Sequence, residues 1–332
     1  MQARGGGNVS RVPVTHDAVV VGGGPAGLAA ATWLARYRRD VVIVDSGDYR
    51  AAPVATSHGY LARDPQDPMD FLRVASHQLE RYRTVTRRPG TVVDARTSAD
   101  GFVLTCADGT TLHSMRVVLA TGVVDACPDL EGFAEHYGRS AFHCPACDGY
   151  DAEGKDVVAY GWDAHLAGFA TSLLNWARSV TILTGGHRFE GDAAYRDVLA
   201  RHGVRVEETP AVRMVGPPED LQGVDLVDGR RVSASLLFFS VAHRPRTEVA
   251  LQLGCEVDSD GYVRVDADGL TTTPGVYAAG DVVPGLQLVQ VAAAQGTVAG
   301  VAAALSLQGQ SGSPLSPQPA PDAIGEARRH SA

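Results

Sequence analysis

The first clear hydrophobic pattern in the chain is a β-branched run at Ala18–Val21, followed by glycines and then an Ala- and Leu-rich stretch with helical spacing. Such a short apolar run predicts a buried strand, so the succession predicts strand, turn and helix. A second apolar strand is predicted at Val41–Val44, with Asp45 at its end. Near the other end, the pattern predicts a strand at Val276–Ala279, a loop and an Ala-rich helix.

Gly22, Gly24 and Gly27 form the pattern Gly-x-Gly-x-x-Gly between the first predicted strand and helix. The first glycine allows a tight turn, the second lets the backbone approach a pyrophosphate, and the third permits close packing of helix and strand. Asp45 stands close to the position expected for a carboxylate that binds a free ribose 2′-hydroxyl. Together these features predict a dinucleotide site; a Gly-rich turn in a flavodoxin-like sheet is the alternative.

Gly280 and Asp281 follow the predicted strand near the other end of the chain. A carboxylate or its backbone neighbour at a strand end can face the ribityl and phosphate groups of a flavin, while a helix N-terminus points toward the ring. This second motif implies FAD rather than NAD as the cofactor. The alternative for Asp281 is a simple turn former.

Residues 155–191 repeat the succession strand, turn, helix and strand, which predicts that the fold of a second nucleotide-binding unit persists. Gly161 keeps the first glycine position, but Asp163 and Leu166 occupy the second and third. A side chain there obstructs the pyrophosphate, and an acid repels it. NADP(H) is therefore a doubtful ligand. His187 and Arg188, after the second strand of this unit, either meet a 2′-phosphate or belong to a solvated loop.

Composition limits the class of protein. The chain has 332 residues, 45% hydrophobic and 20% charged, which is typical of a soluble globular protein with room for two domains. The formal net charge is −9 and no basic run occurs, so we expect no nucleic-acid partner. We see no export signal and no apolar run of transmembrane length, and we expect no membrane association. The five cysteines are too few for a disulfide framework, so a cytoplasmic location is expected.

Cys144 and Cys147 lie two residues apart in the stretch HCPACDG. A zinc site would need further ligands, and the other three cysteines supply no second pair, so we expect no metal. A structural bridge that closes so short a loop would remove little unfolded-state entropy. The remaining interpretation is a redox disulfide, in which local positive potential can hold one sulfur as the reactive thiolate.

Four stretches, VVVGGGPAGLAAA, VVLATGV, HCPACDG and TTPGVYAAGDV, stand in the order found in the thioredoxin reductase-like branch of the two-dinucleotide-fold flavoproteins. The resemblance covers about residues 16–307. Within that branch, DYRAAPVATSHGYLARDPQDPMDFLR and LATGVVDACPDLEGFAEHYGRSAFHCPACDGYD are more similar to the dithiol oxidases of the gliotoxin and holomycin type. The Gly-Gly-Gln segment expected of typical thioredoxin reductases is not found in place of the first of these.

The resemblance implies an α/β fold with two Rossmann-like dinucleotide-binding domains: a three-layer ββα FAD domain and a smaller NAD(P)-type domain inserted into it. The expected division is a tail at 1–15, an FAD domain at 16–124 and 247–308, a domain carrying the cysteine pair at 125–246, and a disordered tail at 309–332. Proline and glycine near both joints, at 120–132 and 240–248, agree with this division. The resemblance also implies a homodimer.

Site roles follow from the same resemblance. Cys147, the second cysteine of the pair, is expected to lie against the flavin, and Cys144 to meet the thiol substrate. Asp148 directly follows the pair, as in thioredoxin reductases, where this aspartate is an acid/base; dithiol oxidases more often have histidine there. His58 and His143 are alternative bases, or else hydrogen-bonded structural residues. The expected FAD-contacting residues are Gly22, Gly24, Pro25, Ala26, Gly27, Asp45, Ser46, Arg50, Ala120, Thr121, Gly122, Gly280, Asp281, Gln290 and Val291.

Three functions remain open from the sequence. The first is an FAD-dependent oxidase that converts a small-molecule dithiol into its disulfide and passes electrons to O2. The second is a thioredoxin reductase-like disulfide reductase, driven by NADPH or by ferredoxin. The third is a flavin-bound redox sensor without significant turnover. The intact cysteine pair and both FAD motifs favour an enzyme.

Overall fold

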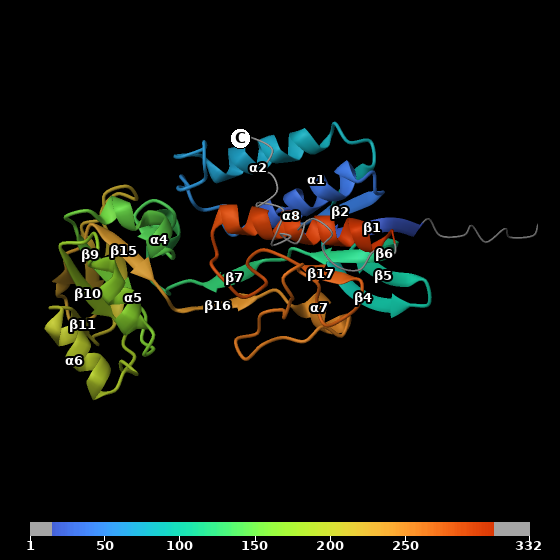
Figure 1. Ribbon diagram of the computed structural model, residues 1–332. Coiled ribbons are helices and arrows are strands. Elements are labelled where there is room, and N and C mark those ends of the chain that lie inside the picture. The colour runs from blue at the N-terminus through green and yellow to red at the C-terminus, as the bar shows by residue number, and fades with distance from the viewer. Residues whose placement is uncertain (1–14, 309–332) are drawn as a thin grey trace, which may run out of the picture.

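A computed structural model describes residues 15–308 as two lobes joined by a pair of strands (Figure 1). The larger lobe contains the first and last described segments, and the smaller lobe is built from the middle of the chain. The tail predicted at 309–332 and all but the last residue of the tail predicted at 1–15 lie outside the described residues.

A seven-stranded sheet in the order β3-β2-β1-β6-β5-β4, with β17 beside β6, forms the larger lobe. Its strands are β1 (Thr15–Val21), β2 (Val41–Asp45), β3 (Val85–Pro89), β4 (Val92–Ser98), β5 (Gly101–Cys106), β6 (Thr111–Leu119) and β17 (Val276–Ala278). The neighbours β3, β2, β1, β6 and β17 are parallel, whereas β4, β5 and β6 form an antiparallel meander.

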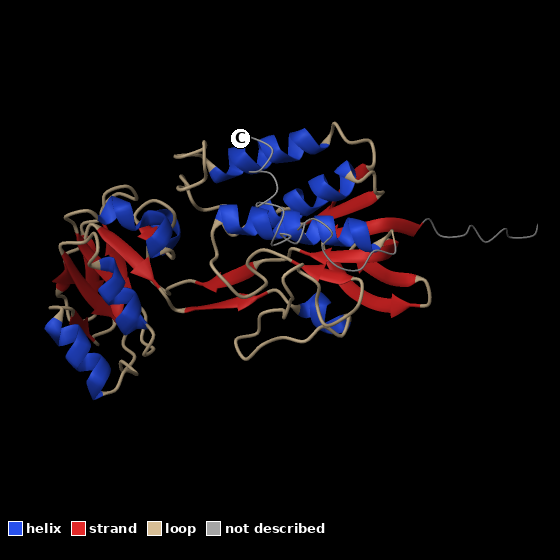
Figure 2. Ribbon diagram, viewed as in Figure 1, coloured by secondary structure: helices blue, strands red, loops and turns tan. Residues whose placement is uncertain are grey.

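The parallel strands β1 and β2 are covered on both faces, which explains their uninterrupted apolar runs. Ala18 and Val20 of β1 belong to the core beneath the helices, whereas Val19 and Val21 belong to the core shared with the meander. Figure 2 shows that long helices lie along one side of the sheet. They are α1 (Pro25–Arg36), α2 (Pro68–Leu79) and α8 (Val289–Ser306); the short α7 (Glu248–Gln252) lies on the other side.

Helices α1 and α8 pack closely because glycines of α8 face the α1 backbone. A Cβ atom added at Gly296 would lie 2.1 Å from the carbonyl oxygen of Ala26, and one added at Gly300 would lie 2.6 Å from that of Ala30. The helices therefore run in the same direction. Among the described residues, α8 is the one helix long and apolar enough to cross a membrane. Its glycine and alanine face is buried against α1, which is the position of a core helix.

The smaller lobe contains a five-stranded parallel sheet in the order β11-β10-β9-β15-β8. Its strands are β8 (Ala141–Phe142), β9 (Asp156–Tyr160), β10 (Ser179–Leu183), β11 (Arg205–Glu207) and β15 (Leu236–Phe239). A small antiparallel sheet consists of β12 (Ala211–Val215), β13 (Gly223–Leu226) and β14 (Arg231–Val232). The helices are α3 (Phe133–His136), α4 (Pro145–Asp148), the 3₁₀ turn η1 (Gly149–Ala152), α5 (Leu166–Leu173) and α6 (Ala193–Arg201).

The two lobes are connected by the antiparallel strands β7 (Val123–Ala126) and β16 (Ala242–Pro245). Both strands lie within the segments in which the chain was expected to cross between domains. The numerical domain boundaries stay a prediction. The α/β fold with two Rossmann-like sheets is confirmed, and β9, α5 and β10 form the strand, helix and strand predicted at 155–191.

Two helical glycines provide a test of the α1–α8 contact. Gly300→Ala places a Cβ against the backbone of α1, and we expect it to lower the free energy of unfolding by about 1–3 kcal/mol. Gly168 of α5 is exposed with no atom within 4 Å of an added Cβ. Gly168→Ala should therefore raise stability by about 0.5–1 kcal/mol. Urea unfolding of the three proteins measures both effects; equal changes would contradict the close helix contact.

Candidate functional site

A cavity of about 550 Å³ lies where the larger lobe meets the cysteine pair of the smaller lobe. Its walls include the loops after β1 and β2, the start of α8, and α4. The predicted residues that line it are Gly22, Gly24, Pro25, Ala26, Asp45, Ser46, Arg50, His58, Ala120, Thr121, Gly122, His143, Cys144, Cys147, Asp148, Gly280, Asp281 and Gln290. Gly27 and Val291, also predicted as FAD contacts, are not part of the lining.

The glycine loop after β1 shows why its glycines are needed. Gly22 has φ +108°, and a Cβ added there would lie 2.2 Å from the carbonyl oxygen of Ala120. A Cβ added at Gly27 would lie 1.9 Å from the oxygen of Gly22, so this glycine permits the helix to pack on the turn. Gly24 differs, because no atom lies within 4 Å of an added Cβ and the residue faces the cavity. The open backbone at Gly24 suits the approach of a pyrophosphate.

Two helix N-termini face this cavity. No described side chain caps α1 at Gly24 or α8 at Leu288, and residues of the first turn of each helix line the cavity. The side-chain oxygen Oε1 of Gln290, in the first turn of α8, is buried without a hydrogen-bond partner among the described residues. Uncapped helix N-termini attract anionic groups, and a buried polar atom needs a partner.

Asp45 lies at the end of β2 with its carboxylate against the glycine loop. A Cβ added at Gly23 would lie 2.1 Å from Oδ2 of Asp45. The backbone N–H of Gly47 donates to Oδ1 at 3.0 Å, and the hydroxyl of Tyr49 donates to Oδ2 at 2.5 Å. The sequence did not reveal Tyr49, which holds the carboxylate predicted to bind ribose.

Cys144 and Cys147 form a disulfide, with their Cα atoms 5.3 Å apart. Cys144 caps the short helix α4, and the backbone N–H of Cys147 donates to its Sγ at 3.1 Å. Of the other cysteines, Cys106 and Cys255 are buried and Cys127 is exposed. Among residues 15–308, no group of three or more His, Cys, Asp and Glu side chains could hold a metal ion.

Asp148, the last residue of α4, is only 6% exposed and lines the cavity beside the disulfide. The pKa of its carboxyl is raised to about 7, mainly by burial. The nearby His58 opposes this shift, and Asp151 contributes to it. An acid with a pKa near 7 can exchange a proton at neutral pH. Asp148 has this property.

The two histidines have different environments. His58 lies on the loop after β2, where its Nδ1 pairs with Asp64 Oδ1 at 3.0 Å. Burial lowers the pKa of His143 to about 4, and the positive charge of Arg50 acts in the same direction. His143 is therefore neutral at pH 7. Its Nδ1 lies 3.2 Å from the hydroxyl of Tyr137, a residue that the sequence did not single out.

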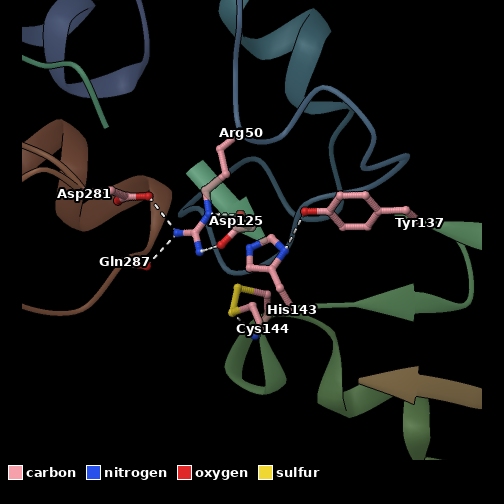
Figure 3. Close-up of a disulfide and its surroundings, with 8 residues drawn as sticks. Arg50, Asp125, Tyr137, His143, Cys144, Asp281 and Gln287 are labelled. Atoms are coloured by element: carbon pink, nitrogen blue, oxygen red, sulfur yellow. Dashed lines mark hydrogen bonds and ion pairs between the residues drawn. A yellow bond between two sulfur atoms is a disulfide. The ribbon is translucent and has the colours of Figure 1, made fainter. Parts of the chain in front are cut away.

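Arg50 connects three segments around the disulfide (Figure 3). Its Nε and Nη2 donate to both carboxylate oxygens of Asp125 at 2.7 and 2.6 Å, and its Nη1 donates to Asp281 at 3.0 Å and to Gln287 at 2.6 Å. Burial would raise the pKa of Asp125, but the hydrogen bonds and charge of Arg50 lower it overall. Arg50 was predicted as a cofactor contact; it also joins the loop after β2 to β7.

The second nucleotide unit is closed at the position where phosphate would bind. Oδ1 of Asp163 accepts the backbone N–H of Leu166, the first residue of α5, at 3.0 Å, so a carboxylate of the chain itself lies at the start of this helix. The side chain of Leu166 is fully buried in the core of the lobe. The rings of Trp162 and His187 stack with centroids 3.9 Å apart above the ends of β9 and β10. These residues do not fit NADP(H).

Comparison with known proteins identifies the class. The family described as pyridine nucleotide-disulphide oxidoreductase matches residues 16–296, and the chain belongs to this family. It is 32% identical over 309 residues to thioredoxin reductase sirT of Leptosphaeria maculans, which covers 87% of this chain and 93% of that protein. It is also 32% identical to thioredoxin reductase tcpT of Claviceps purpurea, over 88% of this chain and 94% of that protein.

Two solved structures are similar along nearly their whole length. The crystal structure of HlmI has a TM-score of 0.83 and 32% identity, and the match covers 97% of this chain and 100% of that one. An oxidoreductase from Agrobacterium tumefaciens has a TM-score of 0.81 and 32% identity, over 90% of this chain and 100% of that one. The protein is therefore a thioredoxin reductase-like, FAD-dependent disulfide oxidoreductase, as its sequence motifs predicted.

Family membership implies FAD, and the residues present fit it. The open backbone at Gly24 and the two uncapped helix N-termini face one cavity that also contains the disulfide. A pyrophosphate at the N-terminus of α1 would satisfy the free N–H groups there. The contribution of each cofactor-contacting residue stays a prediction.

Gly24 gives a direct test of this cofactor site. Gly24→Leu should fold normally, because an added Cβ has no protein atom within 4 Å, but it should purify without colour since the side chain blocks the pyrophosphate. Gly24→Ala should retain part of the flavin. The measurement is flavin absorbance per protein, with circular dichroism as the control for folding. A yellow Gly24→Leu protein, or release of FMN instead of FAD on heating, would contradict the assignment.

Asp148 gives a pH-dependent prediction. The folded pKa of about 7 exceeds the ordinary value of 3.8, so between these pH values the unfolded chain releases a proton that the folded protein keeps. Wild-type stability should therefore fall as pH rises through this window, by about 1.4 kcal/mol per unit, for a total of about 4 kcal/mol. Asp148→Asn removes this loss and should become relatively more stable from pH 4 to pH 8.

The same variant should slow turnover by about 10²- to 10⁴-fold if Asp148 transfers the proton. Thermal unfolding at a series of pH values and steady-state rates measure the two effects. Glu153→Gln, which changes an exposed glutamate five residues away, is the matched control. A stability difference that does not vary with pH would show that the carboxyl titrates normally.

Proposed function

We propose that this enzyme is a dithiol oxidase that converts a small-molecule dithiol into its disulfide and passes two electrons to O2, with hydrogen peroxide as the second product. The observation that supports this most directly is the difference between the two nucleotide units. The FAD cavity contains the disulfide and open helix N-termini, whereas Asp163 closes the helix that would bind NADP(H). Electrons would then enter through the cysteines.

The overall reaction balances as dithiol plus O2 giving disulfide plus H2O2. A substrate thiolate attacks Sγ of Cys144, the Cys144–Cys147 bond breaks, and Cys147 leaves as a thiolate. The second substrate thiolate attacks the substrate sulfur of the mixed disulfide and releases Cys144. FAD, when bound, would accept the two electrons of the resulting protein dithiol and deliver them to O2.

Asp148 is the residue best suited to take a proton from an incoming thiol. Its carboxyl lines the cavity beside the disulfide, and burial keeps its pKa near 7. A base with this pKa is partly ionised at neutral pH and still basic enough to accept a proton. His143 is uncharged and only a weak base at this pH, because its pKa is lowered to about 4.

A disulfide reductase is the second candidate. Asp148 follows the cysteine pair as in thioredoxin reductases, and relatives from Leptosphaeria maculans and Claviceps purpurea carry that name. Because the carboxylate of Asp163 lies at the start of α5, the electron donor for this reaction would be ferredoxin or a separate flavin rather than NADPH. We also propose a cytoplasmic homodimer, as in the family that the sequence resembles.

Anaerobic stopped-flow spectroscopy separates these functions. A small dithiol such as dithiothreitol should bleach the flavin quickly, NADPH should do so very slowly, and air should restore the colour with release of peroxide. Cys144→Ser should abolish bleaching by the dithiol. Fast bleaching by NADPH, at the rate of turnover, would reject the oxidase and restore the reductase. Slow bleaching by both reagents would favour a redox sensor.

A further inference from the structure

The loop after β2, residues 50–58, contacts the smaller lobe through its backbone. The N–H of Ala55 donates to the carbonyl oxygen of Gly138 at 3.2 Å. A Cβ added at Gly138 would lie 2.1 Å from the carbonyl oxygen of Pro53 and 2.6 Å from Cα of Val54. Gly138 is buried, so the loop of the larger lobe rests directly on the bare backbone of the smaller lobe at this point.

Gly138 begins the segment that leads to the disulfide. Its N–H donates to the carbonyl oxygen of Ala141 at 2.8 Å, which closes a tight turn, and β8 then ends two residues before Cys144. The N–H of Leu237 in β15 donates to the carbonyl oxygen of Ser140 at 2.8 Å, so the turn is joined to the sheet of the smaller lobe. A contact that fixes Gly138 therefore also fixes the segment that carries the cysteine pair.

The same loop holds the connection between the lobes at its first residue. Nε and Nη2 of Arg50 donate to both carboxylate oxygens of Asp125, and this bidentate pair is largely shielded from water. Asp125 lies on β7 opposite His243 of β16, so the pair is made to the ribbon of two connecting strands. Figure 3 shows Arg50 between Asp125 on one side and Asp281 and Gln287 of the larger lobe on the other. The connecting strands are thereby held against the larger lobe.

The other side of this loop faces the cavity. Arg50, Val54 and His58 line the cavity together with Cys144 and Cys147. The loop thus forms part of the wall and also contacts the smaller lobe at two separate elements, β7 and the turn before β8. The smaller lobe cannot rotate about one of these contacts without breaking the other.

We infer that residues 50–58 are an interlobe strap, with Asp125 and Gly138 as its two attachment points. The strap holds the smaller lobe in the orientation in which the Cys144–Cys147 disulfide faces the cofactor cavity. The step in which the reduced cysteine pair passes its two electrons to FAD then needs no movement of the lobes. Asp125 and Gly138 are positioning residues, since neither lines the cavity. This inference rests on the proposed entry of electrons through the cysteines and does not depend on the electron acceptor.

Two glycines of the smaller lobe separate the strap contact from backbone strain. Gly138 and Gly132 have φ +79° and +83°, so alanine is unfavourable for the backbone at both. The nearest atom to a Cβ added at Gly132 is the carbonyl oxygen of Met214, at 3.5 Å in the same lobe, whereas a Cβ at Gly138 would collide with the strap. In anaerobic stopped flow with dithiothreitol, Gly138→Ala should bleach the flavin about 10- to 100-fold more slowly than the matched control Gly132→Ala.

Two further readouts distinguish loss of orientation from loss of reactivity. Acid quenching, alkylation and mass spectrometry follow reduction of the Cys144–Cys147 disulfide itself. Dithiothreitol should reduce this disulfide at least as fast in Gly138→Ala as in Gly132→Ala, while the flavin stays oxidised for longer. Hydrogen exchange in the peptide 51–58 of the oxidised holoenzyme should be faster in Gly138→Ala alone, because the N–H of Ala55 loses its acceptor.

Asp125→Asn tests the other attachment point without a change in backbone conformation. It should slow bleaching of the flavin about three- to tenfold, the usual effect of a lost hydrogen bond, and leave reduction of the disulfide unchanged. Asp225→Asn is its matched control, because Asp225 is also bound by two arginines, Arg213 and Arg231, but within the smaller lobe. This control should change neither rate.

Several outcomes would overturn the strap. These are equal bleaching rates in Gly138→Ala and Gly132→Ala, unchanged exchange in the peptide 51–58, or an Asp125→Asn enzyme in which both rates stay at the wild-type value or fall together. If Gly138→Ala does not fold, the Asp125→Asn rates decide. If air does not reoxidise the reduced wild-type enzyme, the oxidase proposal fails and the strap stands. If dithiothreitol does not bleach the wild-type flavin, the proposed electron entry fails, and hydrogen exchange still decides whether the strap contact exists.

Discussion

The close parallel contact between α1 and α8 decides where the chemistry takes place. Gly296 and Gly300 let α8 approach the backbone of α1 near Ala26 and Ala30, and the helices run in the same direction. Their N-termini therefore open at the same end of the sheet, into one cavity. Two segments at opposite ends of the described chain, the glycine loop after β1 and the start of α8, become one anion-binding wall. The cysteine pair of the smaller lobe completes that cavity.

Electrostatics around the disulfide reverse the usual order of acid strength. Burial raises the pKa of Asp148 to about 7 and lowers that of His143 to about 4, so the carboxyl titrates at a higher pH than the imidazole. Paired groups whose environments push their pKa values apart commonly divide the acid–base roles. The same physical cause, loss of water, thus gives the aspartate a pKa suited to proton transfer at neutral pH and leaves the histidine uncharged. Neither role can be read from residue type alone.

Local patterns were enough to predict strands β1, β2, β9, β10 and β17, the glycine loop and the cysteine pair, because each depends on residues close together in sequence. Three features of the site depended on folded contacts instead. Tyr49 is four residues from Asp45, but only the turn after β2 brings its hydroxyl onto that carboxylate. Arg50 pairs with Asp125, far along the chain. Tyr137 is six residues before His143, and only the folded chain brings its hydroxyl to within 3.2 Å of the His143 Nδ1. The charge state of a side chain follows from its burial, which periodicity does not quantify.

The helices that follow β1 and β9 begin with different chemistry, although both belong to the same kind of strand–helix–strand unit. At α1 the first turn begins with Gly24 and no described side chain caps it, so the backbone N–H groups remain open to a phosphate. At α5, a carboxylate oxygen of Asp163 already accepts a hydrogen bond from the backbone N–H of Leu166. A nucleotide phosphate would have to displace this carboxylate and approach its negative charge. The strand, helix and strand still form, because they depend on the apolar core that includes Leu166, and that core is intact. In the reaction that we propose, electrons enter through the cysteine pair instead.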